Sequence, residues 1–372
     1  MMRSTLAIMM TLLLSAGAVQ AEGPGLTVPV ELPDFDPAAP LCQAPPGLNP
    51  VLAFAGDNDR DFIAGVARGL TKAAADRGLV FQQTRADNDP VMMQTQIASF
   101  AAAKVGALVV APIDPVLSKM AVQQVIWSGA YVGAIVPPPA TSILNAPQYL
   151  TGKTLGDAAA AYIADKLNGQ ANVVLLTHDS LEFLAPRFAA IRDSLRSLPG
   201  VTIVADVSPR TVDRAGGAET MRIILLAEAQ IDVVLGADTV VLGALDAMRA
   251  AGQARPEQFF GGIDGETDAI TELTTPGSPY KTTINLAAPI FGYAMGQHAA
   301  DWLEGKSIPQ AMDILPAAIN SNNLARFQID IADPAAVWNN SARRDRYLRM
   351  YGNICYDTRD QYLNFPWSSE AD

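Results

Sequence analysis

The sequence predicts two doubly wound α/β lobes, each built on a parallel β-sheet with helices on both faces. Short apolar runs alternate with amphipathic stretches from residue 51 onward, as expected for successive βα units. The first three runs begin at residues 51, 79 and 107, so they recur every 28 residues, the length of one such unit. Runs such as 108–110 and 173–176 are apolar on both alternating faces, which is typical of parallel strands covered by helices.

The expected elements form two successive sets. The first set has strands at 51–55, 79–84, 107–111 and 131–135, with helices at 62–77, 90–103 and up to residue 128 between them. The second set opens with a helix near 156–167 and continues with strands at 172–177, 201–205, 233–236 and 259–263, separated by helical patterns. Because the same module occurs twice, two lobes are the simplest organisation.

Residues 1–21 have the pattern of a secretory signal peptide. Arg3 precedes an apolar run at 6–14, and small residues lead to a predicted cleavage site between Ala21 and Glu22. The run is far shorter than the roughly 20 apolar residues needed to cross a bilayer, which disfavours a membrane anchor. We therefore expect an exported, periplasmic protein.

Composition indicates a compact globular protein with an acidic surface. The chain is 49% hydrophobic and 17% charged, and its net charge of −12 becomes −13 when the signal peptide, with Arg3, is removed. Nucleic acid and anionic membrane surfaces are poor partners for a protein with this net negative charge, because they repel it.

Residues 22–50 contain eight prolines and little apolar periodicity, so we expect an extended lead-in that lies over the surface.

The two cysteines, Cys42 and Cys355, flank the periodic region. Export to an oxidising compartment allows them to pair, and such a disulfide would join the lead-in to the C-terminal tail. The alternative is two unrelated buried thiols.

Polar side chains follow many of the predicted strands. In doubly wound sheets, ligands bind beyond the carboxyl ends of the strands, so these positions are candidates for a binding site. For any single one, an ordinary solvated loop is an equally good interpretation. The candidates are Asp57, Asn58 and Asp59, with Phe62 close behind, then Asp87 and Asn88, Asp114, His178 and Asp179, Asp238, and Asp264.

In order and spacing, several segments resemble the ribose-binding-like periplasmic proteins, which have the type I solute-binding fold. The resemblance covers about 51–306. It rests on the first strand with its polar turn and Phe62, on 107–112 before Asp114, on Asp238 followed by 242–245, on 262–265, and on 283–285 before Pro289 and Gly292.

The resemblance implies a chain that crosses between lobes three times, through a three-segment hinge. It implies a first lobe of 51–150 plus 287–310, and a second lobe of 151–286 plus 311–335. Residues 336–372 are then a C-terminal extension, rich in aromatic residues and arginines, which we expect to be fastened to the first lobe. A partner-binding role for this extension remains open.

The resemblance also implies that Asp59, Phe62, Asp264 and Asn285 contact the ligand. A carboxylate at Asp264 can accept two hydroxyl hydrogen bonds, whereas the alternative is that it caps the following helix. Phe62 can cover a sugar ring or pack in the core of its helix.

The sequence also departs from the family pattern. Three prolines, 137–139, replace an acidic and basic pair, and an expected ligand arginine falls near Ala185, which leaves Arg187 or Arg210 as a substitute. An asparagine expected beside Asp238 is Ala237. With several aspartates and few cations, a neutral sugar or polyol, or a cationic solute, fits better than an anion.

The predicted function is capture of a small polar ligand, a sugar or polyol, for an ABC transporter permease, by a monomer without cofactor or metal. Catalysis is disfavoured, because His178 and His298 have no nucleophile elbow, metal-ligand cluster or phosphate loop nearby. The alternative is a TorT-like periplasmic sensory protein that signals to a membrane sensor kinase.

Overall fold

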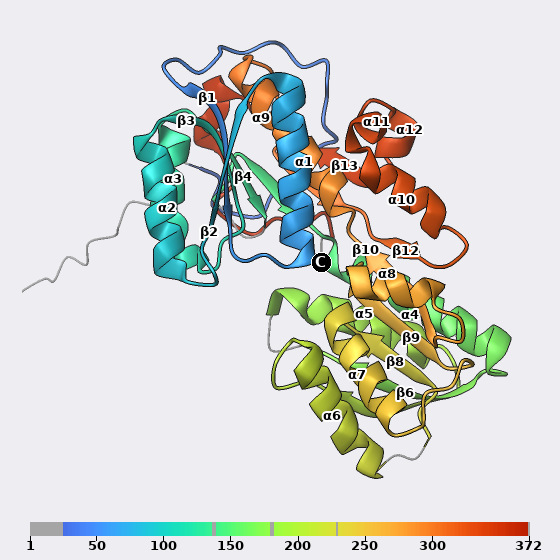
Figure 1. The fold of residues 1–372 in the computed structure, drawn as a ribbon. Helices are drawn as coiled ribbons and strands as arrows, with labels where there is room; N and C mark the ends of the chain where they lie inside the picture. The colour runs from blue at the N-terminus through green and yellow to red at the C-terminus, as the bar shows by residue number, and fades with distance from the viewer. Residues whose placement is uncertain (1–24, 136–138, 179–181, 228–229, 371–372) are drawn as a thin grey trace, which may run out of the picture.

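The computed structural model describes residues 25–135, 139–178, 182–227 and 230–370, which form two α/β lobes (Figure 1). The first sheet has the strand order β13 (Leu348–Tyr351), β11 (Ala311–Ile314), β5 (Ser142–Asn145), β4 (Tyr131–Ile135), β3 (Val105–Val110), β1 (Asn49–Gly56) and β2 (Val80–Arg85). The second has the order β12 (Ala317–Ile319), β10 (Tyr280–Asn285), β9 (Phe259–Asp264), β8 (Val233–Gly236), β6 (Gln170–Leu176) and β7 (Gly200–Val207). All neighbours pair in parallel except the edge strands β12 and β13, which are antiparallel.

Helices connect the strands and cover both faces of the sheets, as their amphipathic patterns predict. The first lobe has α1 (Asp61–Arg77), α2 (Pro90–Ala102), α3 (Pro115–Trp127) and α9 (Ala288–Leu303). The second has α4 (Gln148–Lys166), α5 (Ala185–Arg196), α6 (Arg214–Ala227), α7 (Asp238–Ala250) and α8 (Thr267–Thr274). None of the helices in the described ranges is both long and apolar enough to cross a membrane.

Helices α1 and α9 lie side by side, and glycine allows them to approach closely (Figure 1). A Cβ atom on Gly69 would lie 2.2 Å from the carbonyl oxygen of Pro289, and one on Gly292 would lie 2.1 Å from that of Val66. Any side chain at either position would therefore push the helices apart. This contact fixes α9, which begins directly after one of the crossings between lobes.

The chain crosses between the two sheets three times: from β5 to α4, from β10 to α9, and from β11 to β12. These crossings confirm the predicted three-segment hinge. Each crossing is short, since β5 ends at Asn145 and α4 begins at Gln148, while β11 ends at Ile314 and β12 begins at Ala317.

The predicted boundary at residue 311 is wrong, because residues 311–335 divide between the lobes. Strand β11 pairs with β5 of the first sheet, where Ala311 and Met312 are buried against Ile143 and Leu144, and only β12 joins the second sheet. Two further helices, α10 (Leu324–Ala332) and α11 (Pro334–Trp338), pack on α9. Burial of apolar side chains against β5 and α9 therefore places β11, α10 and α11 in the first lobe.

The C-terminal extension is part of the first lobe. Its strand β13 pairs with β11 and extends the first sheet, and a short helix, α12 (Ser341–Arg344), precedes it. The lead-in is bound to the same region, since the backbone nitrogen of Leu26 donates to the carbonyl oxygen of Tyr362 at 2.8 Å. Trp367 is buried and its indole nitrogen donates to the carbonyl oxygen of Val30.

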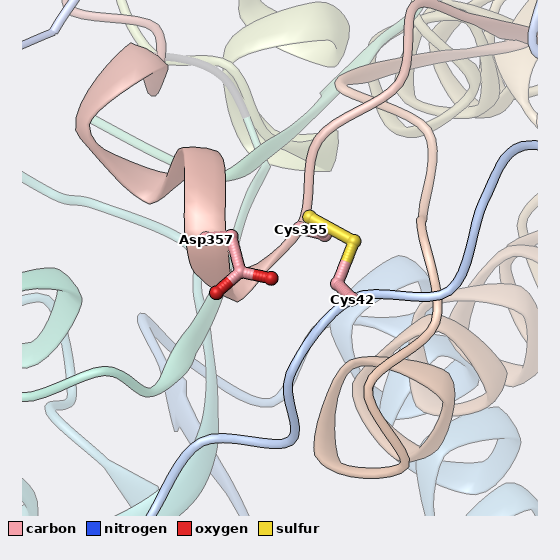
Figure 2. A group of neighbouring side chains, drawn as sticks. All are labelled: Cys42, Cys355 and Asp357. Carbon is pink, nitrogen blue, oxygen red and sulfur yellow. A yellow bond between two sulfur atoms is a disulfide. The ribbon is translucent and has the colours of Figure 1, made fainter.

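The predicted disulfide between Cys42 and Cys355 is present, with Cα atoms 6.3 Å apart (Figure 2). It joins the lead-in to the turn before a 3₁₀ helix, η2 (Tyr356–Gln361). The carboxylate of Asp357 lies beside it and accepts a hydrogen bond of 2.8 Å from the backbone nitrogen of Gln43. Because both sulfurs are bonded to each other, neither is a thiolate ligand for a metal.

Candidate ligand site between the lobes

The two lobes meet where α1 and α8 begin. The Oδ2 atom of Asp61 in the first lobe accepts a hydrogen bond of 2.9 Å from the backbone nitrogen of Thr267 in the second. This bond holds the pKa of Asp61 below its usual value. We use the term interlobe site for the charged residues around this contact: Arg60, Asp61, Arg187, Asp264 and Glu266.

Asp264 ends β9 and contributes a carboxylate to the interlobe site. Its carboxylate accepts no hydrogen bond from any residue that the structure describes, although its side chain is half-buried. Burial raises its pKa, while the charges of Arg187 and Arg60 oppose that rise. A half-buried carboxylate near two cations, with its lone pairs unused by the described residues, can accept hydrogen bonds from the hydroxyl groups of a ligand.

The backbone of Asp264 is strained, which shows that its position is imposed by its surroundings. Its φ angle is 113°, a region that side-chain-bearing residues rarely adopt. It does not cap α8, because the N-cap residue of that helix is Glu266 and the backbone nitrogen of Thr267, at the start of the helix, donates to Asp61. The alternative role of Asp264 as a helix cap therefore has no contact to support it.

Asp238 lies beneath this loop and holds it in place. It is fully buried and accepts hydrogen bonds from the hydroxyls of Tyr280 at 2.6 Å and Thr283 at 2.7 Å, and from the backbone nitrogen of Glu266 at 2.9 Å. Burial raises its pKa to about 8, against the lowering effect of these bonds. These contacts show that Asp238 supports the 264–266 loop from within the second lobe.

Asn285 connects the same loop to a crossing between lobes. Its side-chain oxygen accepts a hydrogen bond of 2.5 Å from the backbone nitrogen of Ala287, and its amide nitrogen lies 3.4 Å from the carbonyl oxygen of Gly265. Gly265 has a φ of 71°, and a Cβ atom there would lie 1.6 Å from the Asn285 amide nitrogen. Glycine is therefore required beside Asn285.

Arg187 supplies a cation from the second lobe. It lies on α5, is 8% exposed, and its Nε atom donates to the side-chain oxygen of Gln148 at 2.9 Å. Burial lowers its pKa, while the charge of Asp264 raises it. Of the two arginines considered as substitutes, Arg187 is the one that faces Asp264.

The polar turn after β1 bonds mainly to itself. Asp57 forms a 2.9 Å ion pair with Arg60, and the amide of Asn58 donates to Asn88 at 3.0 Å. The side chain of Asp59 is 80% exposed and pairs with Arg85 at 3.0 Å, so it points away from the interlobe site. Asp57 therefore acts by orienting Arg60.

The remaining predicted residues have different surroundings. Phe62 is half-buried, with its ring centroid 6.1 Å from that of Phe291 on α9. Asp114 caps α3, accepting hydrogen bonds of 2.9 Å from the backbone nitrogens of Val116 and Leu117. Asp179 lies outside the described residues.

Sequence reasoning missed Asp61 and Glu266. Glu266 is half-buried, and burial together with the charges of Asp264 and Asp61 raises its pKa to about 7. Both residues stand one or two positions beyond the polar residues that the strand ends singled out. Extending each strand-end segment to the first turn of the following helix would have included them.

The geometry is that of two sheets whose strand ends and helix N-termini converge on one charged site. The family model described as periplasmic binding protein domain matches residues 51–307. The chain belongs to this family. The match covers both sheets up to the end of α9 and leaves out the lead-in and the whole region after residue 307.

Relatives agree with this assignment. A putative rhizopine-binding protein of Rhizobium meliloti is 27% identical over 267 residues, which is 68% of this chain and 83% of that protein. The ribose import binding protein RbsB of Bacillus subtilis is 26% identical, over 68% of this chain and 80% of its own length. These relatives are named as binding proteins, not enzymes.

Solved structures show the same fold. An ABC transporter solute-binding protein of Bacillus halodurans with bound myo-inositol superposes with a TM-score of 0.64 at 20% identity, covering 76% of this chain and 98% of that one. One from Actinobacillus succinogenes with bound D-allose gives 0.66 at 16% identity, covering 74% and 99%. The two-lobed, mostly parallel architecture of type I periplasmic binding proteins is therefore shared.

Proposed function

We propose that this protein is exported to the periplasm, captures a sugar or polyol between its lobes, and delivers it to an ABC importer. The observation that carries the proposal is the Asp264 carboxylate, which is half-buried, lies near Arg187 and Arg60, and has no hydrogen-bond donor among the described residues. A ligand with adjacent hydroxyls can donate to the carboxylate and accept from the guanidinium groups.

Charge at the interlobe site supports an uncharged or cationic ligand over an anion. Three acidic groups, Asp61, Asp264 and Glu266, face two basic groups, Arg60 and Arg187. An added anion would be repelled by these acids, whose charges already add to the effect of burial, the main cause that raises the pKa of Glu266. The relatives named for rhizopine and ribose, and the N-terminal pattern of a signal peptide, are consistent with this class of solute and with export.

A thermal-shift screen of the mature protein, begun at Glu22, tests the proposal. D-ribose, D-allose, myo-inositol, an amino sugar and a sugar phosphate form the panel, and any stabilising compound is followed by calorimetry. We expect at least one neutral or amino polyol to raise the Tm, because a ligand that binds only the folded state stabilises it by mass action. A rise with the sugar phosphate alone would contradict the proposal.

A sensory role is the second candidate, and the C-terminal extension favours it. Strand β13 and helices α11 and α12 add to the first lobe a surface that lies beyond the matched residues 51–307. A protein that presents its ligand state to a sensor kinase needs such a surface. Loss of ligand uptake when the gene is deleted would support transport, whereas normal uptake with loss of ligand-dependent gene induction would support sensing.

A further inference from the structure

A cavity of about 820 Å³ lies in the first lobe, and none of its lining residues belongs to the interlobe site. Its walls come from the lead-in, from α9, and from the extension around α11, α12 and β13. The lining includes Phe35, Leu41, His298, Leu315, Trp338 and Met350. Its volume is within the range of about 300 to 1,000 Å³ that is typical of small-molecule sites.

The lead-in forms a fixed wall of this cavity. The backbone nitrogen of Phe35 donates to the carbonyl oxygen of Met350 at 3.0 Å, and that of Cys42 donates to Gly305 at 2.8 Å. The disulfide to Cys355 anchors the same end of the wall (Figure 2). Since both ends are bonded to the lobe, the cavity exists before any ligand arrives.

His298 is the unsatisfied polar group of the cavity. It is 2% exposed, and both of its ring nitrogens are buried without a hydrogen-bond partner among the described residues. Burial lowers its pKa to about 4, so the ring is neutral near pH 7, with one donor and one acceptor nitrogen. A buried polar group without a partner is costly, and a hydroxyl group in the cavity could satisfy it.

An aromatic surface stands next to this histidine. The ring of Trp338 meets that of His298 edge to face with centroids 5.4 Å apart, and the Arg344 guanidinium lies 5.6 Å from the Trp338 ring centroid. Apolar side chains from Phe35, Leu315 and the rest of the lining continue the surface. A flat apolar ligand can pack against these groups.

The charged residues of the lining balance one another. Three acids and three bases are present, and each base has an acidic partner within the lining. The pairs are Asp34 with Arg349 at 3.5 Å, Asp301 with Lys306 at 3.1 Å, and Asp345 with Arg344 at 3.1 Å. Because no charge is in surplus, the cavity favours an uncharged ligand.

We propose that this cavity is a second ligand site, which binds an uncharged aromatic alcohol through its apolar walls and hydrogen-bonds the alcohol's hydroxyl to His298. The cavity shares no residue with the interlobe site, and the proposal does not rest on the sugar-binding function. Leu315 follows β11 in the third crossing between lobes, so an occupant of the cavity also contacts the hinge.

Proton NMR of the imidazole groups tests the site with 2-naphthol as the probe and 2-methylnaphthalene as its hydroxyl-free counterpart. The chain has only two histidines, so a His178→Gln variant assigns both signals. We expect 2-naphthol to shift the His298 signal in a saturable way, and 2-methylnaphthalene to bind about threefold to tenfold more weakly, since it lacks one hydrogen bond. Equal affinities, or no shift, would overturn the proposal.

Two variants separate the contribution of the His298 hydrogen bond to probe binding from that of the apolar cavity. In calorimetric titrations, which do not need the His298 signal, His298→Leu should weaken 2-naphthol binding about threefold to tenfold and leave 2-methylnaphthalene binding unchanged, because only the hydrogen bond is lost. Ala39→Trp, on the partly exposed lead-in, should weaken binding of both probes by occupying part of the cavity, and it keeps the test valid if His298→Leu folds poorly. Unchanged probe binding in Ala39→Trp would place the probe elsewhere and contradict the proposal.

Discussion

The carboxylate of Asp61, at the first residue of α1, is bonded to the backbone nitrogen of Thr267, at the first residue of α8, with a distance of 2.9 Å. The two residues are 206 positions apart in the chain and belong to different lobes. Each stands at a helix N-terminus, where backbone N–H groups and the helix dipole favour a negative charge. The bond therefore links the two lobes directly, outside the hinge.

The first prediction concerns this link. Asp61→Ala removes the bond and should favour the open arrangement of the lobes, with a larger radius of gyration by small-angle X-ray scattering. Ligand affinity should fall about twofold to tenfold, since closure loses one hydrogen bond. Asp59→Ala is the matched control, because Asp59 is exposed and pairs only with Arg85 of its own lobe. Equal scattering curves for the two variants would show that the bond does not contribute to closure.

The second prediction concerns Asp264. Asp264→Ala should weaken binding of the ligand found in the screen by about tenfold to a hundredfold, because a charged acceptor is lost. The Tm should change little, since this carboxylate makes no hydrogen bond to the protein residues that are described. Asp264→Gly should bind equally poorly but be at least as stable as Asp264→Ala, because glycine adopts a φ of 113° without strain. Calorimetry and thermal unfolding measure the two effects, and a large loss of Tm with normal affinity would indicate a structural role.

The third prediction is a pH dependence due to Asp238. Its pKa is about 8 in the folded protein and near 3.8 when the chain is unfolded, so the folded state binds more protons between these values. The contribution of Asp238 to the free energy of unfolding therefore decreases as the pH rises from 4 to 8. Asp238→Asn cannot titrate, so its stability should decrease less over this range than that of the wild type. Urea unfolding at pH 5 and pH 8 measures the free energy of unfolding of the two proteins. Equal changes in both proteins would show that Asp238 does not cause the pH dependence.

The fourth prediction concerns the disulfide. The bonded cysteines are 313 residues apart, and closing a loop of this length stabilises the folded state by about 6 kcal/mol in the chain-entropy treatment. The double variant Cys42→Ser, Cys355→Ser should therefore unfold at clearly lower urea concentration. Peptide mapping of exported protein without reduction should recover the two cysteines as one linked pair. Two freely alkylated thiols in that material would contradict the structure.

The alternation of strands and helices could be predicted because it depends on local patterns. A strand such as β3 is buried on both faces, and its six residues are all apolar or glycine, so its sequence reveals its surroundings. The strand-end rule likewise identified Asp264, and the resemblance to a family supplied Asn285 and the three crossings. The pairing of Cys42 with Cys355 followed from export and from their being the only two thiols.

The tertiary structure decided which lobe each late element joins and what each carboxylate bonds. Strand β11 belongs to the first sheet because the edge of β5 provides its backbone hydrogen-bond partners. The residues at 311–314 do not by themselves indicate which of the two sheets the strand joins. Asp114, Asp238 and Asp264 all follow strands, yet one caps a helix, one is a buried support, and one retains free acceptors. Residue type and spacing predict that a polar group stands at a strand end. Its role depends on the donors that distant segments bring to it, because hydrogen bonds act only over about 3 Å.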